Sequence, residues 1–175
     1  MQSKLQTKIT HKKSLRTKKI ARNIRKRSIK RNKKIKFKTL KVFGINPAGI
    51  KSKLESFNEV LSTLKPQIWM LQETKLKPHE QINCGALDNF QVFYLSRQKS
   101  QGGGLAVGVS KMLESTLLSE GDDDTEVVSV LVVVGDIQIR VIAGYGVQEN
   151  ASKKKKEKFW DYIEQAEAEV VPSSS

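Results

Sequence analysis

The sequence predicts an α/β protein in which β-sheets are flanked by helices, behind a basic tail without regular structure. Two observations predict this class. From about residue 38 the segments follow the order strand, helix, strand, then mainly hairpins, then helix, which is typical of sheets covered by helices rather than of a purely parallel sheet. The 175 residues suit one domain with a sizeable core, and most of the positive charge lies ahead of that domain.

The basic charge is concentrated at the N-terminus. Residues 1–39 hold 17 of the 32 Lys and Arg and none of the 18 Asp and Glu, so the remainder has a net charge of −3. We expect residues 1–37 to form a disordered basic arm, with residues 1–39 binding the phosphates of DNA or RNA in a salt-dependent way. The same composition also fits a nuclear-import signal, a solubilising tail or, less well because lysine dominates, a mitochondrial transit peptide.

The apolar runs, the N-terminus and the cysteine content predict the cellular compartment. The longest apolar runs, such as VLVVV at 130–134, are too short to span a membrane, and the N-terminus has no apolar core of the secretory type. The single cysteine, Cys84, cannot form an intrachain disulfide, which fits a reducing compartment. These features predict a soluble intracellular protein, nuclear if the arm is an import signal and cytoplasmic otherwise.

The first predicted elements are a strand, a helix and a strand, as judged from the spacing of their apolar residues. FKTLKVFGIN (37–46) alternates apolar and polar residues and predicts a strand. Within 50–64, the spacing of Leu54, Phe57, Leu61 and Leu64 predicts an amphipathic helix that ends before Pro66. The apolar run in 67–73 then predicts a second, buried strand.

Hairpins and a last helix complete the pattern. Strands are predicted at 90–96 and at 102–110, where GGG is interpreted as close strand packing because no helix with Lys-Ser/Thr follows it as in a phosphate loop. EVVSVLVVVGDIQIRVIAGYG predicts two strands around the turn Gly135-Asp136. A helix is expected after lysines 153–156, with one shared apolar face made of Phe159, Trp160, Ile163, Ala166 and Val170.

Three polar residues stand at predicted strand ends: Asn46, Glu73 and Tyr145. In open α/β sheets, functional groups collect at such ends. A carboxylate that follows a buried strand either points into water or is paired or bound to a metal, because its desolvation is costly. These three residues are therefore the candidate site.

Several segments together carry a family resemblance: INPAGIKSKLESF, LKPQIWMLQETKL, GGGLAVGV, GYGVQE and KKKKEKFWDYIE. They resemble the first half of the endonuclease/exonuclease/phosphatase superfamily, and more narrowly the apurinic-type endonuclease domain that precedes reverse transcriptase in non-LTR (LINE-like) retrotransposons. The resemblance covers about residues 38–170, and Leu-Gln-Glu-Thr-Lys at 71–75 is its most specific element. It leaves 171–175 as a tail.

The resemblance implies a fold and a chemistry. The implied fold is a four-layer α/β sandwich of two mixed sheets with flanking helices, only partly present here. The implied chemistry is Mg²⁺-dependent phosphodiester hydrolysis. In that scheme Glu73 binds Mg²⁺, Asn46 helps to hold the metal and its network, and Tyr145 donates to the substrate phosphate.

The departures from the family pattern are substantial. Ala48 replaces the acidic or amide residue of the Asn-x-Asp/Asn-Gly loop, and Val147 replaces a proline. The second-half motifs are absent, including the aspartate–histidine general base, and neither His11 nor His79 stands in such a motif. We therefore expect a truncated, inactive endonuclease domain whose partner is a missing C-terminal half or a reverse transcriptase.

Two other functions remain open: a non-enzymatic nucleic-acid-binding protein acting through the arm, and a phosphatase acting on small phosphoesters. If the second half of the sandwich is missing, one sheet should expose an inner face rich in Val and Ile. The protein would then self-associate.

Overall fold

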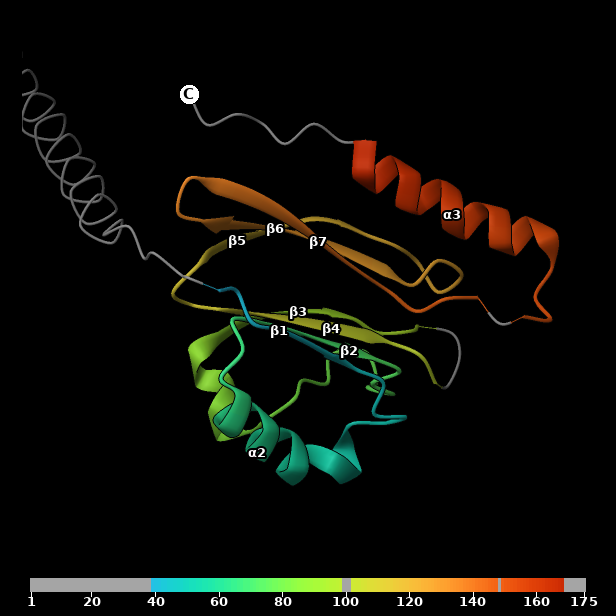
Figure 1. Ribbon diagram of the computed structural model, residues 1–175. Helices are drawn as coiled ribbons and strands as arrows, with labels where there is room; N and C mark the ends of the chain where they lie inside the picture. The colour runs from blue at the N-terminus through green and yellow to red at the C-terminus, as the bar shows by residue number, and fades with distance from the viewer. Residues whose placement is uncertain (1–38, 99–101, 148, 169–175) are drawn as a thin grey trace, which may run out of the picture. The chain divides into compact units, whose positions relative to one another are not determined.

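The computed structural model describes residues 39–98, 102–147 and 149–168, so the predicted arm at 1–37 and tail at 171–175 lie outside the described residues. Seven strands form two sheets (Figure 1). The first sheet has, in spatial order, β1 (Val42–Ile45), β2 (Ile68–Gln72), β4 (Leu105–Ser110) and β3 (Phe90–Leu95). Here β1 runs parallel to β2 and the other pairs are antiparallel, so this sheet is mixed as expected.

The second sheet is antiparallel throughout rather than mixed. It contains β5 (Glu114–Glu120), β6 (Val127–Val134) and β7 (Ile137–Gly144) in sequence order. The sheet is antiparallel because each strand follows the last through a short connection, and the β6–β7 turn places Gly135 at φ 66° as the hairpin signal predicted. The sequence did not predict β5, whose side chains are largely exposed and whose pairing is interrupted by a bulge between Leu117 and Ser119.

The first strand is shorter than expected. The sequence predicted 37–46, but pairing with β2 begins at Val42, opposite Ile68. One residue earlier the Lys41 N–H donates to the side-chain Oε1 of Gln67 at 2.8 Å instead of to the strand ladder. The β1 pairing therefore begins at Val42 because the neighbouring strand β2 begins opposite it, at Ile68.

The first helix follows the predicted pattern after a single turn of 3₁₀ helix, η1 (Lys51–Lys53). The α-helix α2 (Leu54–Leu64) buries Phe57 and Leu61, two of the residues whose spacing predicted it. It ends at Lys65, which adopts a left-handed conformation and donates its N–H to the Leu61 carbonyl. Pro66 follows and cannot continue the helix.

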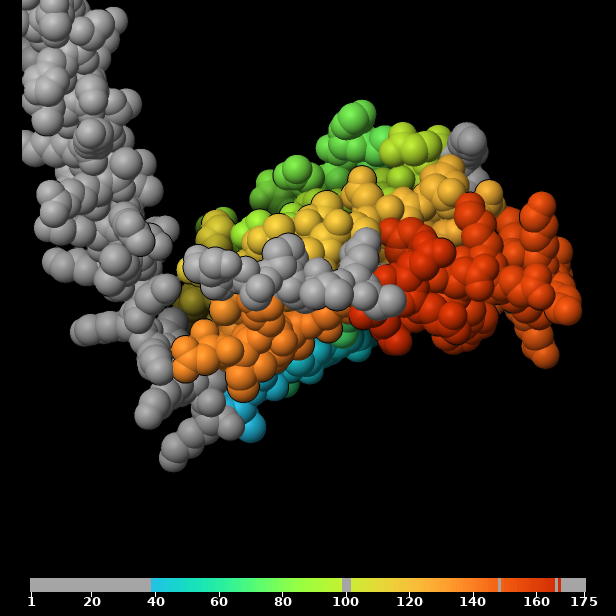
Figure 2. Space-filling model, turned by 90° about the horizontal axis from the view of Figure 1, so that it is seen from above, coloured from blue at the N-terminus to red at the C-terminus, as the bar shows by residue number. Residues whose placement is uncertain are grey.

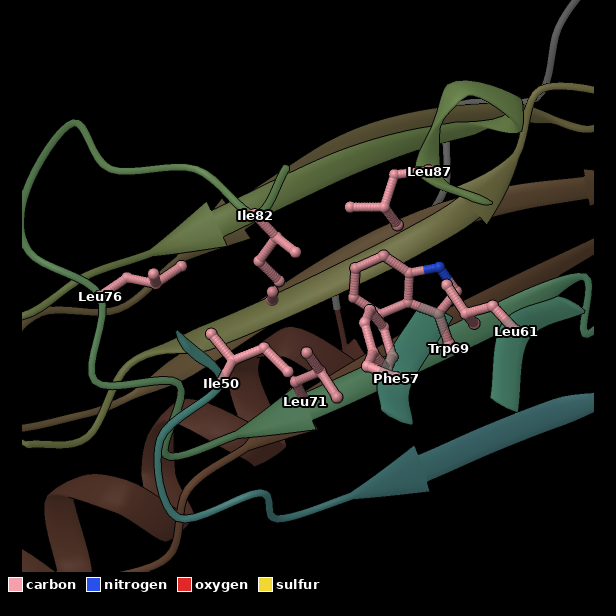
Figure 3. Close-up of a cluster of buried hydrophobic side chains, with 9 residues drawn as sticks. Ile50, Phe57, Leu61, Trp69, Leu71, Leu76, Ile82 and Leu87 are labelled. Atoms are coloured by element: carbon pink, nitrogen blue, oxygen red, sulfur yellow. The ribbon is translucent and has the colours of Figure 1, made fainter. Parts of the chain in front are cut away.

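One apolar core lies between α2 and the outer face of the first sheet (Figure 3). At its centre, Trp69 is fully buried and makes an edge-to-face contact with Phe57, with ring centroids 5.2 Å apart. The indole lies over Gly108 of the neighbouring strand, where an added Cβ would come within 2.0 Å of Trp69 Cε2. The short 3₁₀ helix η2 (Gly85–Asn89) closes this core with Leu87.

A second core fills the space between the two sheets. Its fully buried members are Ile68, Leu105, Val107, Val109, Val130 and Val132, with Val128 only 1% exposed. The expectation of a broadly exposed, Val-rich inner face is wrong for the described residues, because β6 packs its valines against β4. Some exposed apolar side chains lie on edge strands, with Val42 at 53% and Ile45 at 48% on β1 and Ile137 at 64% on β7, and others lie on helices and turns.

The last helix, α3 (Lys153–Ala168), packs on the outer side of the second sheet. Seen from above, α3 (red) lies beside the orange and yellow residues of that sheet (Figure 2). Phe159 is buried against Gly144, where an added Cβ would lie 3.2 Å from Phe159 Cζ. Trp160 does not share this face as predicted: it is 61% exposed, because the next residue of a helix is turned by about 100°.

The described elements therefore stack as helix, sheet, sheet, helix, which is the α/β sandwich expected from the sequence (Figure 1). Among the described residues, neither α-helix is long and apolar enough to cross a membrane.

Candidate active site

Glu73 directly follows β2, and its backbone is fixed on both sides. Its φ of 55° is left-handed, which is uncommon for a residue with a side chain and must be enforced by the surrounding structure. Its carbonyl accepts the N–H of Gly49 at 2.9 Å, while the N–H groups of Thr74 and Lys75 donate to the carbonyls of Gly104 and Gly103. The carboxylate is thus presented at the strand end, with its side chain 21% exposed.

Asn46 reaches Glu73 from the loop that follows β1. Its Nδ2 donates to Glu73 Oε2 at 3.1 Å, and its Oδ1 accepts the N–H of Ala48 at 2.8 Å. These two bonds fix the orientation of the amide, with the nitrogen toward the carboxylate. Because Oδ1 is engaged within the loop, Asn46 acts toward Glu73 as a hydrogen-bond donor.

Tyr145 arrives from the end of β7, in the other sheet. Its hydroxyl donates to Glu73 Oε2 at 3.4 Å. The side-chain amide of Gln72 donates to the carbonyl of Gly144, one residue before the tyrosine, and so ties the end of β2 to the end of β7. The structure therefore brings together all three sequence-predicted residues around one carboxylate.

Lys75 is the charged neighbour of this carboxylate. Its Nζ lies 3.1 Å from Glu73 Oε1, on a side chain that is 46% exposed. The Lys75 ammonium, followed by the Asn46 amide, lowers the pKa of Glu73 below its ordinary value of 4.5, so the group is ionised at neutral pH. Burial, together with the negative charge of Glu73, raises the pKa of Tyr145 above 10.0, which keeps its hydroxyl protonated as a donor.

An ion pair between Arg97 and the buried Glu126 supports the site. Glu126 is 3% exposed and accepts hydrogen bonds from the Arg97 guanidinium and from the N–H of Gly104. The carbonyl of Glu126 accepts the N–H of Tyr145 at 2.9 Å. Glu126 thereby links the tyrosine to the glycine loop that holds Thr74 in place.

The glycine loop shows the close packing that the sequence predicted. Gly103 and Gly104 have φ values of 61° and 86°, a region that favours glycine. An added Cβ at Gly104 would lie 2.7 Å from Thr74 Oγ1, and one at Gly103 would lie 2.5 Å from the Glu126 carboxylate. Side chains at these positions would displace the segment that presents Glu73.

The described residues offer one carboxylate to a Mg²⁺ ion at this site. Mg²⁺ prefers near-octahedral oxygen coordination and is usually held by one or two carboxylates together with waters and substrate phosphates. Among the residues described, no three His, Cys, Asp or Glu side chains come together in a group able to hold a metal. Glu73 is the carboxylate of this cluster, Lys75 already contacts one of its oxygens, and Ala48 presents a methyl group in the neighbouring loop. The described residues thus supply one carboxylate ligand rather than a complete metal site.

Sequence reasoning missed several residues that build the site. The pairing of Lys75 with Glu73 had a signal in their spacing of two residues, but Gln72, Arg97 and Glu126 act through contacts across 19 to 72 positions. His79 lies exposed in the loop after β2, and no hydrogen bond joins it to the candidate residues within the described part of the chain.

Known structures identify the architecture. The endonuclease domain of TRAS1, a telomere-specific non-LTR retrotransposon, superposes with a TM-score of 0.53 at 16% identity, over 72% of this chain and 54% of that one. An AP endonuclease from Leishmania major gives 0.55 at 17% identity, over 73% and 46%. The described residues share the fold of about half the length of each of these endonuclease structures.

A third structure with this fold, the 3′ phosphatase NExo from Neisseria bound to a product DNA hairpin, gives a TM-score of 0.53 at 21% identity, over 73% of this chain and 51% of that one. The chain thus spans about half the length of the endonuclease/exonuclease/phosphatase structures that it matches. No protein-family profile and no curated protein sequence matches it.

Proposed function

We propose that the chain contributes one half of a Mg²⁺-dependent DNA endonuclease domain of retroelement type and does not cleave DNA by itself. One observation carries the proposal. Asn46, Glu73 and Tyr145 come from the ends of three strands in two sheets, and the amide and the hydroxyl converge on one oxygen of the carboxylate, at 3.1 and 3.4 Å. Such convergence at strand ends is where α/β enzymes place their reactive groups.

The roles proposed for these groups follow from their hydrogen bonds. Tyr145 keeps its proton and can turn its O–H from Glu73 toward a phosphate oxygen that enters the site. Asn46 holds the carboxylate in position through its Nδ2. Further acidic ligands and a general base would have to come from a second half-domain, as the family resemblance implies, and no metal-dependent step is assigned to the residues described.

Plasmid nicking tests the proposal. The purified chain should not nick supercoiled DNA above background, with or without Mg²⁺. Co-expression with the C-terminal half of a retrotransposon endonuclease domain should produce Mg²⁺-dependent nicking that Glu73→Gln removes. Glu80→Gln is the matched control, because Glu80 is also a partly exposed, lysine-paired carboxylate in the loop after β2. Nicking by the chain alone, or nicking by the complex that survives Glu73→Gln, would refute the proposal.

The charge distribution favours a second candidate, a nucleic-acid-binding protein that acts through residues 1–39 without chemistry. That arm carries 17 basic and no acidic residues, whereas the rest of the chain is net negative. Under this alternative, DNA binding survives Glu73→Gln and co-expression restores no nicking. Either function would place the protein in the nucleus, with the arm serving also as an import signal.

A further inference from the structure

One side of the outer helix α3 is exposed along its length. Phe159 is buried against the second sheet, and the Lys155 and Lys158 ammonium groups pair with the acidic loop before β6, at 2.7 and 2.8 Å. These contacts fix the rotation of the helix about its axis. They leave Trp160 outside the contact with the sheet, with 61% of its surface exposed. Because α3 is the outermost layer on its side of the sandwich (Figure 1), this indole is open to a second molecule.

The charges along this side of α3 are divided by the tryptophan. Lys153 and Lys156 lie seven and four residues before Trp160, and Glu164 and Glu167 lie four and seven residues after it. Residues separated by three, four or seven positions share one face of a helix, so these five form a single face, called here the Trp160 face. Lys156 is half-buried and the other four are exposed. The Trp160 face is thus basic at one end, acidic at the other and apolar in the middle.

This order of charges opposes the helix dipole. The first turn of α3 contains no acidic residue and its last turn no basic one, although lysines near the N-terminus and carboxylates near the C-terminus destabilise a helix. Glu164 and Glu167 form no ion pair with another residue that the structure describes. Lys153 lies 3.5 Å from Glu157, but 90% of its side chain is exposed. Most of this charge therefore remains available to a partner that brings the opposite sign.

A second copy of α3 that runs antiparallel complements the Trp160 face. A two-fold axis through Trp160 places each residue before the tryptophan opposite the residue equally far after it in the other copy. Lys153 then faces Glu167 of the second copy, and Lys156 faces Glu164 of the second copy. The two indoles meet at the axis, and the antiparallel helices also bring opposite ends of their dipoles together. The face is therefore complementary to itself in charge and in the position of its apolar group.

We propose that the chain forms a symmetric dimer through the Trp160 face, in which the lysines of each α3 pair with the carboxylates of the other. The proposal concerns the outer helix and takes nothing from the proposed DNA chemistry. A helix of 16 residues is about 24 Å long, so two of them bury less surface than a standard interface of about 1,600 Å². We therefore expect a weak dimer, with a dissociation constant on the order of 10 µM and Trp160 as its central anchor.

Sedimentation equilibrium of the full chain, free of nucleic acid and in about 0.15 M salt, tests this inference. The wild type should change from monomer to dimer between about 1 and 100 µM. Trp160→Ala should weaken the dimer at least about tenfold, because a buried aromatic anchor carries much of the energy of a small interface. Circular dichroism should show that every variant keeps the fold of the wild type.

Charge reversal distinguishes the Trp160 face from other surfaces. Lys153→Glu/Lys156→Glu makes both ends of the face acidic, and Glu164→Lys/Glu167→Lys makes both ends basic. Each variant should remain monomeric at about 100 µM, because like charges would face each other across the two-fold axis. An equal mixture of the two variants should dimerise again, since every pair in the mixed dimer then joins opposite charges.

Glu55→Lys/Glu59→Lys is the matched control, because it makes the same change in net charge at two exposed positions of α2 and should leave the dimer intact. A wild type that stays monomeric at about 100 µM would overturn the inference, and this is the result expected if another segment of the same chain covers α3. A dimer that survives either charge reversal would also overturn it and would assign the contact to another surface, such as the edge strand β1. A mixture that stays monomeric would overturn it as well. None of these outcomes depends on whether a reconstituted domain nicks DNA, so the two proposals fail separately.

Discussion

Removing the Arg97 guanidinium should destabilise the protein more than any change to a surface ion pair. Glu126 is 3% exposed, and Arg97→Met would leave its carboxylate buried with the Gly104 N–H as its remaining partner among the contacts described above. Breaking a buried pair in this way costs about 3–5 kcal/mol. Because the Arg97 side chain is itself 27% exposed, water can partly replace it, and we expect about 3 kcal/mol.

Urea denaturation followed by circular dichroism measures this cost, and in a thermal scan it should lower Tm by about 10 °C for a domain of this size. Glu126→Gln should cost less, since the amide oxygen can still accept the Gly104 N–H. In the double variant the losses should fall short of additivity by at least about 1 kcal/mol. Lys155→Met, which breaks an exposed pair with Asp124, should leave the midpoint unchanged. A loss below about 1 kcal/mol for Arg97→Met, or full additivity with Glu126→Gln, would refute the reasoning.

Three further predictions concern the last helix, acid stability and the arm. Phe159→Ala should cost about 3–4 kcal/mol of unfolding free energy because the ring is buried, whereas Trp160→Ala at a 61% exposed position should be near neutral; equal effects in urea melts would contradict the assignment of the two faces. The pKa of Glu73 is lowered in the folded state, so the stability that its contacts supply is present above pH 4.5 and is lost as the pH falls through the folded pKa. Glu73→Gln should therefore lose less stability than the wild type between pH 6 and pH 3, and parallel pH profiles would argue against these contacts. Deleting residues 1–39 should remove most of the affinity for a duplex oligonucleotide and most of its salt dependence. For the full chain, the logarithm of the binding constant should fall by roughly 0.9 per tenfold rise in salt for each phosphate neutralised. An unchanged slope in a fluorescence-anisotropy titration of the deletion variant would assign binding to the rest of the chain.

Local patterns were enough to predict most of the elements. The helical spacing in 50–64 and the hairpin around Gly135 depend on neighbouring residues, and both occur where the sequence predicted them. The same reasoning missed β5, because an edge strand with largely exposed side chains carries little apolar alternation. It also placed Trp160 with Phe159, because a cluster of aromatic residues does not show which of them meets Gly144.

For the candidate site, the sequence by itself determined that Asn46, Glu73 and Tyr145 stand at strand ends, because the apolar runs before them stop there. Only the tertiary structure decided that the three meet. That meeting depends on the packing of one sheet on the other and on the bond from Gln72 to Gly144, groups that are 72 residues apart. The position of the Lys75 ammonium on Glu73 was likewise decided by left-handed backbone angles and by the loop at Gly49, because a charge two residues away can point anywhere until the backbone is fixed.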